Sequence, residues 1–84
     1  MHVEFFGIPR ERAGVSELDI DAATLGELLK ALADRFPGLR QLVTPDGLDA
    51  SVTINLNGDL FVNDPKTLLA EDDNVLLLSA DAGG

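Results

Sequence analysis

Apolar and polar residues alternate with a period of two in several short stretches, which is the pattern of strands with one buried face. In residues 15–20, Leu18 and Ile20 alternate with acidic residues. Residues 3–6 form another short run of strand-forming residues, which a glycine and a proline end. We therefore expect an N-terminal hairpin whose loop, containing residues 10–14, is longer than a tight turn.

One amphipathic helix is predicted after this hairpin. Thr24 lies three residues before Glu27, the spacing of a capping box, in which each side chain accepts a hydrogen bond from a backbone amide near the other. Apolar residues then recur at helical spacing and form one stripe: Leu25, Leu28, Leu29, Leu32 and Phe36. Gly26 costs about 1 kcal/mol relative to alanine, which the stripe can offset. The Pro-Gly pair at residues 37–38 is expected to end the helix.

The second half of the chain predicts three more strands. Residues 52–57 alternate apolar with polar, and residues 60–63 follow the Asn-Gly turn signal at Asn57 and Gly58. Residues 74–79 contain an unbroken apolar run between polar residues, as in a strand that is buried on both faces. We therefore expect this last strand at the centre of a sheet.

Two intervening segments carry weaker signals. Residues 44–51 are rich in turn formers and predict a mobile loop, whereas residues 66–70 predict a short turn of helix. In the resulting order of elements, one helix can cover one face of one mixed sheet of about five strands. Because the C-terminal strand is expected beside the first, the predicted fold class is α+β, with a ubiquitin-like β-grasp arrangement.

The chain length supports one domain. Its 84 residues are too few for two hydrophobic cores. We place the β-grasp domain at residues 1–78 and a flexible C-terminal tail, ending in Gly-Gly, at residues 79–84.

The composition excludes most catalytic arrangements. Cysteine is absent, which excludes disulfides, thiolate metal sites and a catalytic thiol. The single histidine, His2, gives too few parts for a catalytic triad. The acidic run at residues 71–73 does not fit a calcium loop, because the twelfth position counted from Asp72 is Gly83 and not glutamate. We expect no enzyme activity, no metal site and no cofactor bound by this chain.

The charge balance indicates which partners the chain can have. Fifteen acidic residues against six basic ones give a net charge of −9, so nucleic acids and anionic membranes should repel it. A basic surface on a protein partner would attract it. The N-terminus resembles no signal peptide, and no stretch reaches the roughly 20 apolar residues of a membrane helix. We expect a cytoplasmic protein.

The last six residues carry the remaining chemical signal. Two adjacent glycines at a given site have a chance frequency of about 0.5%, given average glycine usage. A carboxylate is unreactive until it is activated, for example as an acyl-adenylate, and an enzyme that does this must draw the chain end into a narrow channel. Glycine passes where a side chain would not. The small residues of the expected tail suit such a channel: Ser79, Ala80, Asp81, Ala82, Gly83 and Gly84.

The whole chain resembles the MoaD/ThiS family of ubiquitin-like sulfur carriers, and the MoaD branch best. FFGIPRERAG is similar to a family strand followed by an Arg-Glu-x-x-Gly element, here Arg10, Glu11 and Gly14. INLNG resembles the family strand that ends in Asn-Gly, here Asn57 and Gly58. LAEDDNVLLLSADAGG resembles the family's acidic turn, apolar last strand and terminal glycines.

The resemblance implies a carrier function. A partner related to ubiquitin-activating enzymes uses ATP and magnesium to adenylate the terminal carboxylate, and sulfur from a persulfide then replaces AMP. Gly84 would carry the resulting thiocarboxylate, and Gly83 would provide clearance. In the MoaD branch the carrier is the small subunit of molybdopterin synthase, and its tail enters the large subunit, which transfers the sulfur to a pterin precursor. The sheet face near the tail would dock on these partners.

Other uses of the same terminal chemistry stay open. Molybdopterin-synthase carriers often end in a Pro-Pro-Val-Ser-Gly-Gly-like stretch, and this chain has no prolines there. A carrier for cysteine, tungsten cofactor, thiamine or tRNA thiolation would have a similar sequence. A ubiquitin-like modifier would join Gly84 to lysines of target proteins, and a plain interaction module would not use its tail.

Overall fold

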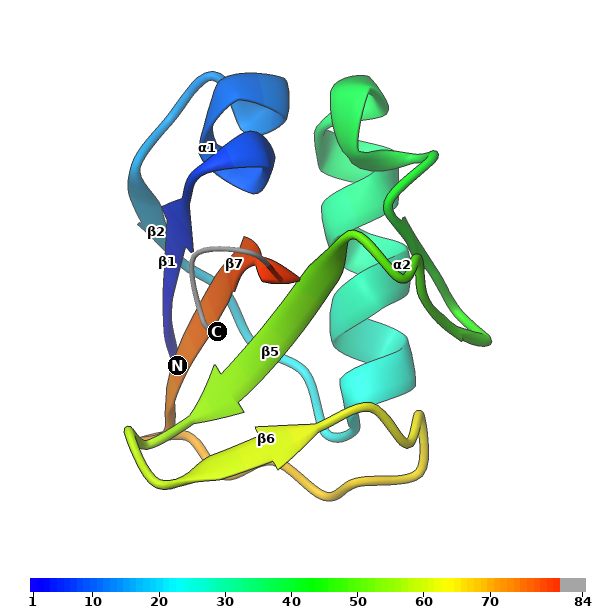
Figure 1. The fold of residues 1–84 in the computed structure, drawn as a ribbon. Coiled ribbons are helices and arrows are strands. Elements are labelled where there is room, and N and C mark those ends of the chain that lie inside the picture. The colour runs from blue at the N-terminus through cyan, green and yellow to red at the C-terminus, as the bar shows by residue number, and fades with distance from the viewer. Residues whose placement is uncertain (81–84) are drawn as a thin grey trace.

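The computed structural model describes residues 1–80, which form a five-stranded mixed sheet with one long helix against one face (Figure 1). The strand order is β2-β1-β7-β5-β6. The strands are β1 (His2–Phe6), β2 (Glu17–Asp19), β5 (Val52–Leu56), β6 (Leu60–Val62) and β7 (Asn74–Ser79). Strand β7 pairs parallel with β1 and antiparallel with β5. The last strand is therefore central and next to the first, which confirms the predicted β-grasp fold.

Helix α2 (Leu25–Arg35) is the long helix predicted from the apolar stripe. The Glu27 amide donates to Thr24 Oγ1 at 3.2 Å, and the Ala23 amide donates to Glu27 Oε2 at 2.8 Å, which is a reciprocal cap. The leucines of the stripe are fully buried against the sheet: Leu25, Leu28, Leu29 and Leu32. The helix ends before Phe36, and a short 3-10 helix, η1 (Pro37–Leu39), follows.

Gly26 has a role that helix propensity alone does not indicate. Its amide donates to the Pro65 carbonyl at 2.9 Å. A Cβ at this position would lie 3.2 Å from the Pro45 carbonyl oxygen and from Pro65. The missing side chain therefore lets two loops approach the first turn of α2, which partly explains a residue that otherwise lowers helix stability.

Three local predictions are wrong. The segment expected as a loop after β1 contains helix α1 (Ile8–Ala13), with proline in its first turn and Gly14 as its left-handed C-cap. The segment expected as a mobile loop contains a small hairpin of β3 (Val43–Thr44) and β4 (Gly47–Leu48).

The third wrong prediction concerns residues 66–70, which are not helical. Leu68 forms an isolated bridge with Thr24, and the Leu69 amide donates to the Ala23 carbonyl at 3.0 Å. These tertiary contacts hold Leu68 and Leu69 beside the start of α2, and they override the weak helical preference of the segment. Within residues 1–80, no helix is both long enough and apolar enough to cross a membrane.

Candidate functional site: the root of the tail and the outer face of the sheet

The first two residues of the predicted tail, Ser79 and Ala80, are here called the root of the tail, and hydrogen bonds attach both of them to the sheet. Ser79 is the last residue of β7, pairs with Val52 and is only 8% exposed. The Ala80 amide donates to the Ser51 carbonyl at 2.9 Å. The prediction that the flexible tail begins at Ser79 is therefore wrong for these two residues, because hydrogen bonds hold both of them.

The remaining predicted tail residues are Asp81, Ala82, Gly83 and Gly84, and these lie outside the described residues. Their roles stay predictions. Ser79 and Ala80 fix the point from which this segment starts, at the end of the central strand.

The side chain of Ser79 ties this point to the start of α1. Its Oγ accepts a hydrogen bond of 2.7 Å from the Ile8 amide, one of the free donors at the N-terminus of that helix. Gly7 makes the approach possible, because it has φ of 72° and because a Cβ there would overlap the Ser79 hydroxyl. Gly7 and Ile8, which are far from Ser79 in sequence, therefore hold the root of the tail in place. Neither residue was identified from the sequence as part of the site.

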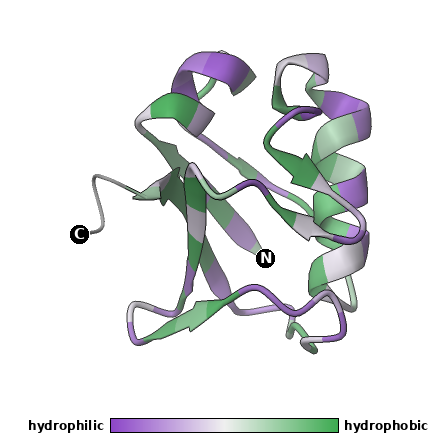
Figure 2. Cartoon of the chain, turned by 45° about the vertical axis from the view of Figure 1, so that its right-hand side comes forward, coloured by the Kyte–Doolittle hydropathy of each residue, from purple (hydrophilic) through white to green (hydrophobic). Residues whose placement is uncertain are grey.

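The face of the sheet away from α2, here called the outer face, carries exposed apolar side chains. Phe5 points into the core, so its neighbour Phe6 points outward and is 54% exposed. Strand pairing places Leu76 and Leu78 of β7 on the same face, where Leu76 is half-buried and Leu78 is buried. Phe61, on the edge strand β6, is 65% exposed there, and Figure 2 shows that strand as hydrophobic along its length. The outer face therefore offers apolar surface beside the root of the tail.

The outer face is also acidic. None of the five strands of the sheet contains lysine or arginine. Glu4 lies on this face in β1, and Glu17 and Asp19 lie beside it in β2. Four of the basic residues are instead on α1, at the end of α2 or just after η1: Arg10, Arg12, Arg35 and Arg40. A protein that docks on the outer face should present apolar and basic groups.

The Asn-Gly motif and the acidic turn meet at the start of β7. Asn57 has φ of 57°, and its side chain donates to Asp73 Oδ1 at 2.9 Å and accepts from the Asn74 amide at 2.8 Å. The Ala70 amide donates to Asp73 Oδ2 at 2.7 Å. The hydrogen bonds from Ala70 and Asn57 lower the pKa of Asp73 below its ordinary value. This arrangement aligns the central strand and does not form a reactive site.

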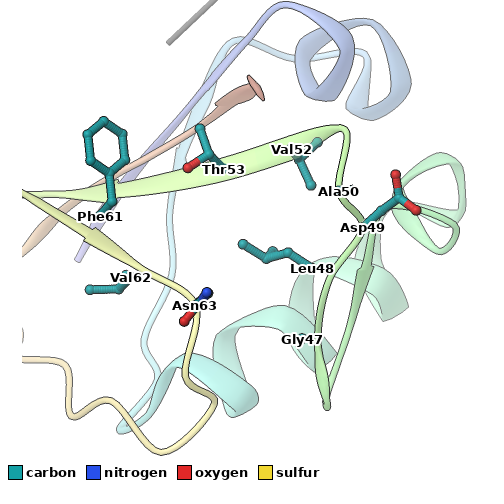
Figure 3. A pocket seen from close by; sticks show the side chains of 9 residues that line it. All are labelled: Gly47, Leu48, Asp49, Ala50, Val52, Thr53, Phe61, Val62 and Asn63. Atoms are coloured by element: carbon teal, nitrogen blue, oxygen red, sulfur yellow. The ribbon is translucent and has the colours of Figure 1, made fainter. Parts of the chain in front are cut away.

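An open hollow of about 450 Å³ lies between β4 and the β5–β6 pair (Figure 3). The residues around it are Gly47, Leu48, Asp49, Ala50, Val52, Thr53, Phe61, Val62 and Asn63. Asp49 is the only titratable one among these described residues, and hydrogen bonds from the Ser51 hydroxyl and amide lower its pKa. A single exposed carboxylate without a partner base does not make a catalytic site.

The Arg-Glu-x-x-Gly motif lies on helix α1 and at its C-terminal end. Arg10 and Glu11 lie on α1, and both are exposed. Gly14 ends that helix, and its amide donates to the Arg10 carbonyl at 3.0 Å. The Arg-Glu-x-x-Gly element therefore forms the second half and the C-cap of the short helix whose first amide, that of Ile8, donates to Ser79.

Comparison with known proteins agrees with this geometry. The solution structure of small archaeal modifier protein 1 from Methanosarcina acetivorans is 26% identical, with a TM-score of 0.76 over 99% of this chain and 94% of that one. A candidate molybdopterin converting factor, subunit 1, from Pyrococcus furiosus is 28% identical, with a TM-score of 0.78 over 93% of both chains. The BexX/CysO complex of Amycolatopsis orientalis contains a chain of the same fold, 24% identical, with a TM-score of 0.78 over 99% of this chain and 98% of that one.

No curated protein sequence matches this chain significantly. The sequence model of the ThiS family, however, matches residues 3–84, nearly the whole chain. Members of this family are small ubiquitin-like carriers or synthase subunits, not enzymes themselves. The chain belongs to the ThiS family of ubiquitin-like sulfur carriers.

Proposed function

We propose that this protein carries sulfur as a thiocarboxylate on Gly84, and that it serves molybdopterin biosynthesis. The observation that supports this most directly is the course of β7. The central strand runs through the apolar outer face, is locked at Ser79, and leads into the segment that contains Gly83 and Gly84. A partner enzyme can therefore bind the folded domain while it modifies the chain at the glycines.

The fixed root limits where a partner can act. Four residues follow Ala80, and an extended chain spans at most about 3.6 Å per residue, or about 14 Å in all. The reactive centre of the partner must therefore come within about 14 Å of Ala80. A partner can satisfy this limit only if it docks close to this end of the sheet.

The chemistry at Gly84 needs groups from other molecules. In the first step a carboxylate oxygen attacks the α-phosphate of ATP held with magnesium by an adenylating enzyme, which gives the acyl-adenylate and pyrophosphate. A persulfide then attacks the acyl carbon and AMP leaves. The resulting acyl disulfide becomes the thiocarboxylate when a second thiol cleaves its S–S bond. This chain has no cysteine, so both thiols come from partners.

Docking is proposed on the outer face. Phe6 and Phe61 would fill apolar recesses of the adenylating enzyme and of the large synthase subunit, since exposed aromatic residues commonly act as binding anchors. The acidic residues Glu4 and Glu17 would face basic groups and speed association. The likeness to the Pyrococcus furiosus protein supports the molybdopterin pathway for the sulfur.

The experiment measures the intact mass of the chain after incubation with a ThiS-family adenylating enzyme, ATP, magnesium and a persulfide donor. We expect one oxygen to be replaced by sulfur in the wild-type chain. Deleting Gly84 should abolish this change without altering the circular dichroism spectrum. Leu68→Ala, on an exposed side chain away from the outer face, is the control and should react normally. If the chain without Gly84 still gains sulfur, the proposal is wrong.

A second candidate function is conjugation to proteins. The printed name of the Methanosarcina acetivorans relative, a small archaeal modifier, favours it. Here a lysine amine would attack the acyl-adenylate and release AMP. Higher-mass conjugates in host extracts, lost on deletion of Gly84, would indicate this function, whereas copurification with a large synthase subunit would indicate the molybdopterin pathway.

A further inference from the structure

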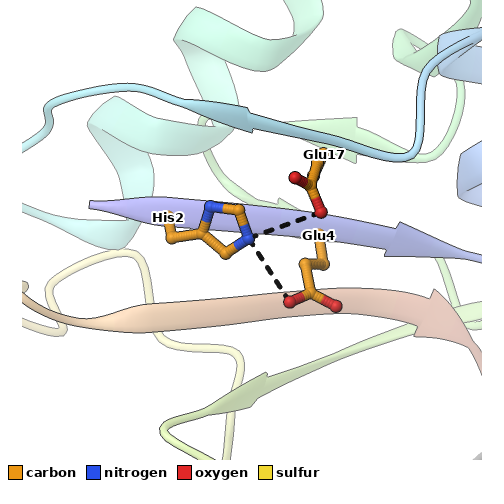
Figure 4. A group of neighbouring side chains, drawn as sticks. All are labelled: His2, Glu4 and Glu17. Atoms are coloured by element: carbon orange, nitrogen blue, oxygen red, sulfur yellow. Dashed lines mark ion pairs between the residues drawn. The ribbon is translucent and has the colours of Figure 1, made fainter.

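A cluster of metal-ligand side chains lies on the outer face, at the end of β1 opposite to Phe6. His2 Nε2 lies 3.3 Å from Glu4 Oε1 and 3.7 Å from Glu17 Oε2, and the three side chains converge (Figure 4). From the sequence we considered His2 only as a member of a catalytic triad and predicted no metal site. Glu17 comes from a different strand, so only the register of β1 with β2 brings the group together.

We propose that His2, Glu4 and Glu17 form a binding site for a divalent first-row transition metal of the Zn²⁺ kind. Zinc binds imidazole nitrogen and carboxylate oxygen at about 2.0–2.2 Å. Two ligands of one tetrahedral ion are therefore about 3.3–3.6 Å apart. The measured distances of 3.3 and 3.7 Å are close to this spacing. Three protein ligands leave a fourth position for water or for a ligand from another molecule.

The other nitrogen of the imidazole supports this assignment. His2 Nδ1 lies 3.3 Å from Asp19 Oδ1, so Nδ1–H can donate to a carboxylate while Nε2 faces the ion. This is the usual arrangement of a metal-bound histidine, whose second nitrogen is held by a carboxylate or a carbonyl. Asp19 is therefore a positioning residue and not a ligand.

The backbone and the charges also favour a bound cation. Glu4 and Glu17 are direct cross-strand partners, and like charges at such positions destabilise a sheet unless a cation lies between them. The backbone next to the cluster is fixed on both sides: the Phe5 amide donates to the Ser16 carbonyl at 2.8 Å, and the Ile20 amide donates to the Met1 carbonyl at 3.0 Å. The ligands thus start from held positions, and a metal would relieve the repulsion between the two carboxylates.

The test is a calorimetric titration of the tag-free, full-length chain with zinc chloride. We expect a saturable isotherm with one ion per chain. His2→Gln and Glu17→Gln should each weaken binding at least about tenfold, and Asp19→Asn should weaken it by about tenfold. Glu11→Gln, on α1, removes the same charge as Glu17→Gln and should leave binding unchanged, which separates coordination from general attraction to an acidic chain.

A second measurement reports on the imidazole itself. Because the chain has one histidine, its ¹⁵N spectrum contains one pair of ring nitrogens. Zinc should shift the Nε2 resonance and leave Nδ1 as the protonated nitrogen. Absence of saturable binding would overturn the proposal. Equal affinity of the His2→Gln variant, or binding that leaves the ring resonances unmoved, would also overturn it. None of these results bears on sulfur transfer at Gly84.

Discussion

Phe5 and Phe6 are neighbours in β1, yet they belong to different parts of the molecule. Phe5 is 3% exposed and packs edge-to-face on Phe36, with ring centroids 5.7 Å apart. Phe6 is 54% exposed on the outer face. The same kind of side chain therefore stabilises the fold on one face and remains available to a partner on the other.

The two faces of the sheet have different tasks. The inner face packs on α2, and most of its apolar side chains are buried in one core, although Leu60 on the edge strand β6 is 57% exposed. The outer face combines exposed aromatic rings with carboxylates, and the strands of the sheet contain no lysine or arginine. Substitutions on the inner face should change stability, whereas those on the outer face should change binding.

Exchanging each phenylalanine for alanine tests this difference most strongly. Phe5→Ala should lower the free energy of unfolding by about 3–5 kcal/mol, because it leaves a cavity in the core. Phe6→Ala should change it by less than about 0.5 kcal/mol. Urea denaturation measures both values. Similar losses in the two variants would show that the outer face also contributes to the core.

The close contact between Gly7 and Ser79 gives the next largest expected change in the free energy of unfolding. Gly7→Ala should destabilise the protein by about 2–4 kcal/mol, since the backbone is left-handed there and the new Cβ overlaps the Ser79 hydroxyl. Gly14→Ala is the matched control, because Gly14 has φ of 78° with open space around it. It should cost only about 1–2 kcal/mol. Equal losses in urea denaturation would contradict a specific contact between Gly7 and Ser79.

Partner binding should depend on the outer face. If the adenylating enzyme docks there, Phe6→Ala should weaken its affinity by about tenfold through loss of a buried aromatic anchor. Leu68→Ala removes a side chain that is 79% exposed but lies near the start of α2, and it should leave affinity unchanged. Surface plasmon resonance can compare the two variants. An equal loss in both would argue against docking on the outer face.

The smallest effect concerns the turn before β7. The pKa of Asp73 is lowered in the folded state, so the folded protein binds fewer protons than the unfolded one. Its stabilisation is therefore present above the ordinary aspartate pKa of about 3.9 and is lost as pH falls through the lowered value.

Asp73→Asn should be less stable than the wild type at neutral pH, and the difference should shrink in acid. Thermal unfolding between neutral and strongly acidic pH measures it. Asp72→Asn removes the same charge from an exposed neighbour and serves as the control. A constant difference at all pH values would contradict this role of the Asp73 carboxylate.

Local sequence signals predicted the elements that are stabilised by hydrogen bonds between near neighbours in sequence or by burial of their own apolar residues. The cap at Thr24 and the leucine stripe specified α2, and the apolar run before Ser79 specified a central strand. Helix α1 was missed, although Pro9 in its first turn and Gly14 at its end are helix-boundary signals, because its exposed polar sequence has no clear apolar stripe. The β3–β4 hairpin was missed because its strands are only two residues long.

The sequence by itself determined the family resemblance, the β-grasp order of elements and the glycines on which the proposed chemistry depends. Only the tertiary structure decided that Ser79 Oγ accepts a hydrogen bond from the Ile8 amide, because these two residues lie near opposite ends of the chain. It also decided that Glu4, Glu17 and His2 converge. Strand register is set by packing and hydrogen bonds between distant segments, so contacts that depend on it are not specified by any local pattern.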